Sequence, residues 1–263
     1  MLADFEKLEK PKKYDDNENK LKKELHDALD LAVRSSVSGA EKVAVAFSGG
    51  LDSSIMAYLV AKYSMPMLFC VGFKDSHDVI NARKSAELLG FELNIISLEE
   101  TDLGKYFART VELVGTTDRL ITDLNVPLYI ILEEIGKHGF DKLVLGQGAD
   151  TLFGGFARYP YSENFGDEIL QDIKNIGKTN LVYNYKIFDN FKMKPIYPFL
   201  EKDVVDIAVK SDPGLKIRDG VQKYILRETF REYLPENIVD LPKKSFQYGS
   251  GIHKALRKFS KEN

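Results

Sequence analysis

The sequence has few of the residues that build disulfide and metal sites. Cys70 is the single cysteine among 263 residues, so no disulfide can form within the chain. Redox, zinc and sulfur-transfer chemistry that needs two cysteines is therefore excluded within one chain. The four histidines are scattered, and no two have the spacing of metal ligands; they are His26, His77, His138 and His253.

Long apolar runs and a strong net charge are also absent. No stretch approaches the ~18 apolar residues that a membrane-spanning helix needs, and residues 1–7 lack the apolar core of a signal peptide. The net charge of −3 and the pI of about 5.9 argue against a general nucleic-acid-binding surface. We therefore expect a cytoplasmic protein with no membrane partner, for which nucleic acid is a disfavoured ligand.

The order of apolar patterns predicts an α/β fold. A chain of 263 residues with 44% hydrophobic content can bury the core of one large domain. Alternating strands and helices favour a doubly wound, mostly parallel sheet with helices on both faces, with ligands at the carboxyl ends of the strands. The expected strands are 43–47, 67–71, 92–96 and 142–145, and the expected helices are 53–63, 77–89, about 99–113 and 127–138.

The two ends of the chain depart from this alternation. Residues 1–20 are rich in charged side chains and Asn, so we expect an N-terminal arm that orders weakly or docks elsewhere, ahead of one domain over 21–263. From about residue 157 the strand pattern fades, and helical patterns predict a C-terminal helical lobe over 157–263. Residues 241–263 hold six Lys or Arg against one acid, which indicates either a solvated basic terminus or part of an anion site.

Residues 43–54, Val-Ala-Val-Ala-Phe-Ser-Gly-Gly-Leu-Asp-Ser-Ser, predict a strand, a tight turn and a helix start. Unpaired N–H groups and the positive end of a helix dipole favour an anion at such a place. Gly49 and Gly50 allow the backbone to approach a phosphate closely. The alternative is an ordinary strand–helix turn, but the coincidence of a strand, two glycines, an aspartate and three serines favours a phosphate site; the serines are Ser48, Ser53 and Ser54.

The same loop lacks the lysine of a Walker A motif, because no lysine lies between Phe47 and Ala61. Asp52 stands there instead. A carboxylate beside a polyphosphate is repulsive unless a divalent cation bridges them, so Asp52 implies Mg²⁺.

Two later stretches carry similar signals. Residues 145–156 hold four glycines and Asp150 after the last predicted strand, where Asp150 would share a cation with Asp52; the alternative is a Gly-rich connection that serves packing alone. Lys243 and Lys244 precede a Gly-Ser-Gly loop, and two cations beside backbone donors suit a pyrophosphate or the charge that develops during adenylation.

Together these motifs resemble the synthetase domain of asparagine synthetase, a family of N-type ATP pyrophosphatases with an adenine nucleotide alpha hydrolase-like fold, related to β-lactam synthetase. The resemblance covers about residues 40–255 and is carried by SGGLDSS, G-x-G-A-D-x-L-F-G-G, P-F-L-E at 198–201, K-x-I-L-R and L-P-x-x-I followed by a lysine. It implies cleavage of ATP between the α- and β-phosphates.

The resemblance also implies roles for individual residues. Asp52 and Asp150 would hold Mg²⁺, Lys243 would be the catalytic lysine with Lys244 as its assistant, and Gln147 would lie beside the adenylate. The pyrophosphate loop would be Ser48, Gly49, Gly50, Leu51, Asp52, Ser53 and Ser54. The adenosine site would be lined by Phe47, Val71, Leu145 and Gly146.

The sequence departs from the family in three respects. Leu2 stands where the glutaminase domain has its nucleophilic cysteine, and about 40 residues leave no room for that domain. We therefore expect nitrogen from ammonia, a separate glutaminase subunit or an amine substrate, and leave a homo-oligomer open. The usual Glu near the adenylate is Gln147, and two positions expected to bind the aspartate carboxylate are Asp123 and Ile196.

The leading hypothesis is a ligase that adenylates a small-molecule carboxyl group and passes the acyl group to ammonia or an amine, with asparagine biosynthesis as the nearest assignment. One alternative is an adenylating enzyme of tRNA modification, against which the acidic pI counts. The other is a non-catalytic ATP-binding regulatory module, in which Gln147 marks lost chemistry.

Overall fold

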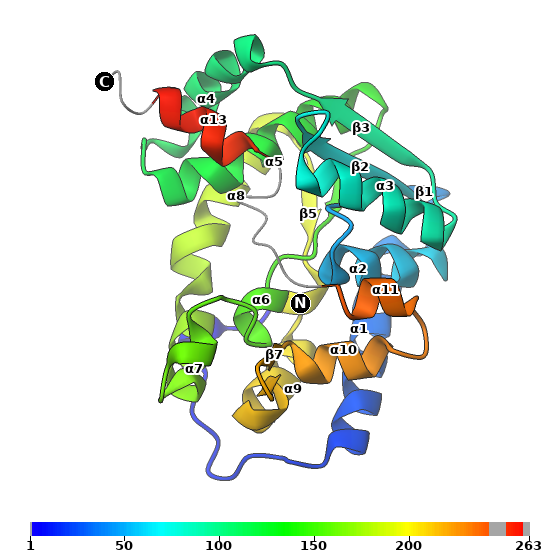
Figure 1. Ribbon diagram of the computed structural model, residues 1–263, viewed down its shortest axis with the longest axis vertical. Helices are drawn as coiled ribbons and strands as arrows, with labels where there is room; N and C mark the ends of the chain where they lie inside the picture. Colours follow the sequence, from blue (N-terminus) through cyan, green and yellow to red (C-terminus); the bar gives the residue numbers. More distant parts are fainter. Residues whose placement is uncertain (1, 242–250, 260–263) are drawn as a thin grey trace.

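A five-stranded parallel sheet forms the centre of the protein (Figure 1). The computed structural model describes residues 2–241 and 251–259. The strand order is β3-β2-β1-β4-β5, and every neighbouring pair is parallel. The strands are β1 (Lys42–Ala46), β2 (Met65–Gly72), β3 (Leu93–Ser97), β4 (Lys142–Val144) and β5 (Lys194–Ile196). The chain runs outward from β1 to β3 and then returns to β4, which confirms the doubly wound topology.

Helices cover both faces of this sheet, and the side chains of the central strands alternate between two apolar clusters. On β1, Val43 and Val45 face one cluster while Ala44 faces the other. The first cluster packs against α1 (Glu18–Val37), α2 (Leu51–Ala61) and α3 (His77–Leu89). The second packs against α4 (Glu100–Val114), α5 (Arg119–Lys137), α8 (Val182–Phe191) and α13 (Ile252–Phe259). Burial on both faces explains why the predicted strands read as continuous apolar runs.

Helix α5 begins earlier than the sequence suggests. It was expected over 127–138 with Pro127 in its first turn, but it begins at Arg119, where the carboxylate of Asp118 accepts a hydrogen bond from the Leu120 N–H at 2.8 Å. Pro127 therefore lies inside the helix, where it cannot donate a backbone hydrogen bond. The buried apolar face of α5, from Val126 to Ile135, packs on the sheet and maintains the helix across this position.

The N-terminal arm docks on the rest of the protein. Ala3 N–H donates to the Leu200 carbonyl at 3.1 Å, and Phe5 is buried in the first apolar cluster. Asp15 N–H donates to Lys210, and the Asp15 carbonyl accepts from Asp212. The arm thus docks along α9 (Lys202–Lys210), and α1 (Glu18–Val37) begins within the last residues of the predicted arm.

The prediction that strands end near residue 157 is wrong for three short strands. Strand β5 pairs with β4 at the sheet edge, and β6 (Ile217–Arg218) pairs with β7 (Val221–Gln222). Strand β5 has three residues and contains a proline, which an edge strand tolerates. The remaining helical segments are α6 (Ala149–Leu152), α7 (Phe165–Ile176), a π-helical turn (Gly177–Leu181), α10 (Tyr224–Phe230) and α11 (Glu236–Val239), with short 3-10 turns at Phe5–Lys7, Tyr159–Tyr161, Pro198–Leu200 and Pro213–Leu215.

Within residues 2–241 and 251–259, the search for a helix with the length and hydropathy of a membrane span finds none.

Candidate functional site

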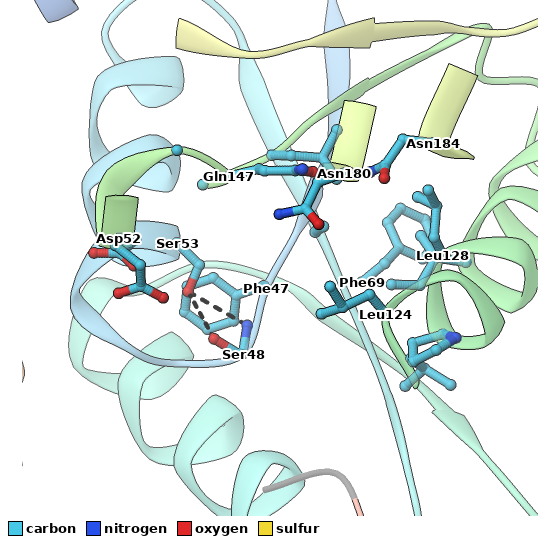
Figure 2. A pocket seen from close by; sticks show the side chains of 18 of the residues that line it. Phe47, Ser48, Asp52, Ser53, Phe69, Leu124, Leu128, Gln147, Asn180 and Asn184 are labelled. Carbon is cyan, nitrogen blue, oxygen red and sulfur yellow. Dashed lines mark hydrogen bonds between the residues drawn. The ribbon is translucent and has the colours of Figure 1, made fainter. Parts of the chain in front are cut away.

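A cavity of about 320 Å³ opens at the carboxyl ends of β1 and β4, where the order of the strands reverses (Figure 2). Ligands of doubly wound folds bind at this point. Four residues predicted to hold phosphate or metal line it, namely Ser48, Asp52, Ser53 and Asp150. The four predicted for adenosine also line it, namely Phe47, Val71, Leu145 and Gly146, as does Gln147. The topology therefore brings two separate sequence motifs, residues 43–54 and 145–156, together with the end of β2 in one cavity.

The remaining residues of the loop after β1 do not line the cavity but pack against the neighbouring helices. Gly49 has a φ of 75°, and an added Cβ would lie 2.5 Å from the backbone carbon of Asn81 in α3. Gly50 is the N-cap of α2, and the Leu51 and Ser54 side chains are buried. These four residues are outside the cavity lining. The close approach of Gly49 to α3 gives one reason for the glycine at this position, because a side chain there would meet the backbone of that helix. Lys243 and Lys244 lie outside the described residues.

Local hydrogen bonds shape the loop after β1. The Ser53 hydroxyl donates to the Gly50 carbonyl at 3.1 Å and accepts from the Ser48 N–H at 3.3 Å. The two hydroxyls of Ser48 and Ser53 lie 3.4 Å apart, and Figure 2 shows both at the same end of the cavity as Asp52. The positive end of α2 and two hydroxyls thus face the same space, an arrangement suited to an anion.

A lysine that we had not predicted as a site residue joins the two aspartates. The Lys223 ammonium lies 2.6 Å and 2.7 Å from the two carboxylate oxygens of Asp52 and 2.6 Å from Asp150 Oδ1. Its side chain is only 4% exposed. Asp52 and Asp150 therefore converge on an ammonium of the same chain, and the Mg²⁺ that we expected them to share stays a prediction. The signal for Lys223 was the K-x-I-L-R motif, which we had read as family resemblance alone.

Charge keeps Lys223 protonated despite its burial. Burial alone acts to lower the pKa of the lysine, but the carboxylates of Asp150 and Asp52 outweigh it, and the net pKa is raised. An added Cβ on Gly155 would lie 2.1 Å from Asp150 Oδ1 and 2.5 Å from Lys223 Cε. Gly155 therefore permits the close packing of this cluster, which gives one glycine of the second motif a structural role.

Gly146, in the loop after β4, likewise permits close packing against the start of α2. An added Cβ there would meet Asp52 Cβ at 3.0 Å and the Ser53 nitrogen at 3.3 Å. The loop after β4 can thus lie directly against the start of α2.

On β2, burial raises the pKa of the Cys70 thiol to about 12, so this cavity residue stays a neutral thiol at physiological pH.

The residues that depart from the family pattern lie in different places. Gln147 lines the cavity, and its Oε1 accepts a hydrogen bond from Asn184 Nδ2 at 2.8 Å. Asp123 is outside the lining; it is buried on α5 and pairs with His253 of α13. Ile196 belongs to β5, where its carbonyl accepts from the Leu145 N–H at 3.0 Å. Of the three, only Gln147 can contact a ligand in this cavity.

The described residues contain no group of three or more His, Cys, Asp or Glu side chains able to hold a metal. Mg²⁺ commonly needs fewer protein ligands than this, because one or two carboxylates bind it together with the phosphates of the substrate.

The fold and the site define a doubly wound α/β protein with a loop suited to a phosphate and two carboxylates at the switch point. The asparagine synthase family model matches residues 24–169 and 160–263, which is most of the chain. The chain belongs to the asparagine synthase family.

Curated relatives named as asparagine synthetases agree with this assignment. A protein of Methanocaldococcus jannaschii, named as a candidate glutamine-hydrolyzing asparagine synthetase, is 30% identical over an alignment that covers 100% of this chain and 56% of the relative. Escherichia coli asparagine synthetase B is 28% identical over 88% of this chain and 45% of its own length. The chain thus spans about half the length of the curated relatives it matches. Among solved structures, a predicted subunit of tRNA methyltransferase from Methanocaldococcus jannaschii has a TM-score of 0.41 at 19% identity, covering 83% of this chain and 88% of that one.

Proposed function

We propose that this protein is an ATP- and Mg²⁺-dependent adenylating ligase. It joins a carboxylate to AMP with release of pyrophosphate and then transfers the acyl group to ammonia or an amine. The observation that carries the proposal is the convergence of Asp52, Asp150 and Lys223 beside the phosphate loop, in a member of the asparagine synthase family.

The charges of the cluster suit a metal-bound triphosphate. Two aspartates and one lysine leave a formal charge of −1, so the cluster alone would repel ATP. Both carboxylates are hard oxygen donors that already converge on one point, which fits Mg²⁺. Mg²⁺, when bound with ATP, neutralises phosphate charge and makes the α-phosphorus more electrophilic.

The residues of the chain then divide the work. Ser48, Ser53 and the start of α2 hold the β- and γ-phosphates, and Phe47 and Val71 border the adenosine. A carboxylate oxygen of the acid attacks the α-phosphorus, the bond from that phosphorus to the bridging oxygen breaks, and pyrophosphate leaves with the electron pair. Lys223, which contacts both aspartates, holds the two carboxylates in position beside the phosphates.

The second step needs a nucleophile that has already lost its extra proton. The nitrogen lone pair attacks the acyl carbon, AMP leaves with the electron pair of the broken acyl–oxygen bond, and the proton that the nitrogen then loses passes to the departing phosphate or to water. Gln147 cannot accept a proton from an ammonium ion, because its amide is not basic. We therefore propose that the nitrogen reaches this site as neutral ammonia or amine, supplied from solution or by a glutaminase.

The test is to incubate the protein with ATP, Mg²⁺, ammonium and carboxylic acids that include aspartate, the acid implied by the names of the relatives. The proposal predicts AMP and pyrophosphate in equal amounts, with a rate that depends on Mg²⁺ and on the acid. ATP binding without turnover, over a broad set of acids, would contradict the ligase and favour a regulatory module.

Lys243 is proposed as the residue that stabilises the charge of the adenylate. Lys243→Ala is expected to leave the Kd for ATP within a few-fold of its original value, while the rate of pyrophosphate release falls roughly 10²- to 10³-fold because a charged donor to the transition state is lost. Calorimetric titration with ATP and a coupled pyrophosphate assay measure the two effects separately. Lys254→Ala, an exposed lysine of α13, is the control and should change neither. Unchanged pyrophosphate release in Lys243→Ala would remove this residue from the mechanism.

A further inference from the structure

We propose that the acid substrate carries one carboxylate and an uncharged hydrogen-bonding group, such as a carboxamide, where aspartate would carry its second carboxylate. This inference rests on the proposed ligase function and names the substrate class of the same site.

Three amide side chains meet at one wall of the cavity. Gln147 follows β4, Asn180 belongs to the π-helical turn, and Asn184 lies on α8. Figure 2 shows them near one another, apart from the phosphate end with Ser48 and Asp52 and from the apolar wall with Leu124 and Leu128. A substrate whose carboxylate reaches the α-phosphorus beside the phosphate end would place its remaining atoms against this amide wall.

One hydrogen bond within the wall orients two of its three amides. Asn184 Nδ2 donates to Gln147 Oε1 at 2.8 Å, and the Asn184 side chain is buried, with the residue 7% exposed. Gln147 Nε2 is then the atom of that side chain that can donate to a ligand, and Asn184 Oδ1 is an atom that can accept. A carboxamide, which both donates and accepts, matches this pair better than a carboxylate, which only accepts.

The charges around the cavity act against a second carboxylate. Its ionisable lining residues in the described part of the chain are Asp52, Asp150 and the thiol of Cys70, so the lining itself supplies no positive charge. The nearby Lys223 ammonium already contacts both aspartates. A carboxylate buried without a cation is costly, and like charges nearby raise that cost.

Position 123 adds no positive charge beside the cavity. Asp123, one residue before the cavity residue Leu124, is an acid itself and pairs with His253. The side chains that the described structure places at the amide wall therefore select by hydrogen bonding and not by charge.

The experiment compares matched acids that differ only in a carboxylate or a carboxamide: aspartate with asparagine, glutamate with glutamine, and succinate with succinamate. With ATP and Mg²⁺ at one pH and one concentration, the amide member of each reacting pair should release pyrophosphate at least about 10-fold faster. Equal or faster release with the dicarboxylate would overturn the proposal.

Placing a cation in the wall should reverse this preference. Asn180 is half-buried and lines the cavity, so Asn180→Lys should shift the rate ratio toward the dicarboxylate by at least about 10-fold. Asn190→Lys, at an exposed position on α8, adds the same charge away from the cavity and should leave the ratio unchanged. Gln147→Lys serves as a second variant if Asn180→Lys does not fold. An unchanged ratio in the folded cavity variant would count against the proposal.

Failure of the ligase function and failure of the substrate class give different results. If no acid in the panel releases pyrophosphate, the proposed function fails, and the substrate class is decided by calorimetric binding of the same pairs in the presence of Mg²⁺ and α,β-methylene-ATP. Tighter binding of the amide member supports the class. Equal binding, tighter binding of the dicarboxylate, or binding of neither member overturns it.

Discussion

Lys223→Met is expected to lower the rate of pyrophosphate release by roughly 10²-fold, because Asp52 and Asp150 lose the ammonium that positions them beside the phosphates. The same change should lower the free energy of unfolding by about 3 kcal/mol, the lower end of the range for breaking a buried ion pair. The lower end applies because the Asp52 and Asp150 side chains keep 21% and 33% of their surface exposed. Urea unfolding and a coupled pyrophosphate assay measure both effects.

The Lys223→Met variant also tests whether the two carboxylates hold Mg²⁺. Without the ammonium, Asp52 and Asp150 repel each other, and a bound divalent cation would relieve that repulsion. Millimolar Mg²⁺ should therefore raise the melting temperature of the variant more than that of the original protein. Lys202→Met, which removes an exposed i,i+4 pair with Asp206, is the matched control and should cost less than about 1 kcal/mol. An equal loss in the free energy of unfolding for Lys223→Met and Lys202→Met would show that Lys223 does not neutralise the two aspartates.

Gly49→Ala is expected to destabilise the protein by about 3 kcal/mol, because two effects add. The φ of 75° is unfavourable for a residue with a Cβ, by about 1–2 kcal/mol. The new atom would also lie 2.5 Å from the backbone of Asn81, and backbone atoms at the start of α3 cannot move aside as a flexible side chain would. The free energy of unfolding in urea is the measurement.

Two other glycines separate these contributions. Gly39 has a φ of 85° and nothing within 4 Å of an added Cβ, so Gly39→Ala should show the backbone effect alone, about 1–2 kcal/mol. Gly50 has a φ of −78°, and its nearest contact would be Ser48 Oγ at 3.5 Å, so Gly50→Ala should change stability by less than about 1 kcal/mol. If Gly49→Ala lowered the free energy of unfolding no more than Gly39→Ala does, the close contact with α3 would make no contribution of its own.

The sequence predicted the sheet well where strands are long and buried on both faces. Strands β1 and β2 read as apolar runs, and their order with the intervening helices implied a parallel, doubly wound sheet. Strand β5 was missed because three residues with a proline carry no strand period. The start of α5 was misplaced because Pro127 was taken as a first-turn residue, whereas tertiary packing maintains the helix on both sides of it.

The sequence predicted individual residues of the candidate site, but it did not predict the contacts that distant segments make there. Motif residues such as Ser48, Asp52 and Asp150 could be named from local patterns, and the topology brings them to one cavity. The contact from Lys223 spans 171 residues to Asp52, and no local pattern encodes such a distance. Asn180 and Asn184 were missed for a related reason, since an asparagine in a helix has no periodic signal of its own.

The central claim is that the cluster of Asp52, Asp150 and Lys223 supports cleavage of ATP between the α- and β-phosphates. Phosphorus NMR of a reaction with ATP, Mg²⁺, ammonium and the best acid of the panel tests it most directly. Resonances of AMP and pyrophosphate should grow together, and both should be lost in Asp52→Asn. Formation of ADP and inorganic phosphate, or the same AMP and pyrophosphate in Asp52→Asn, would contradict it.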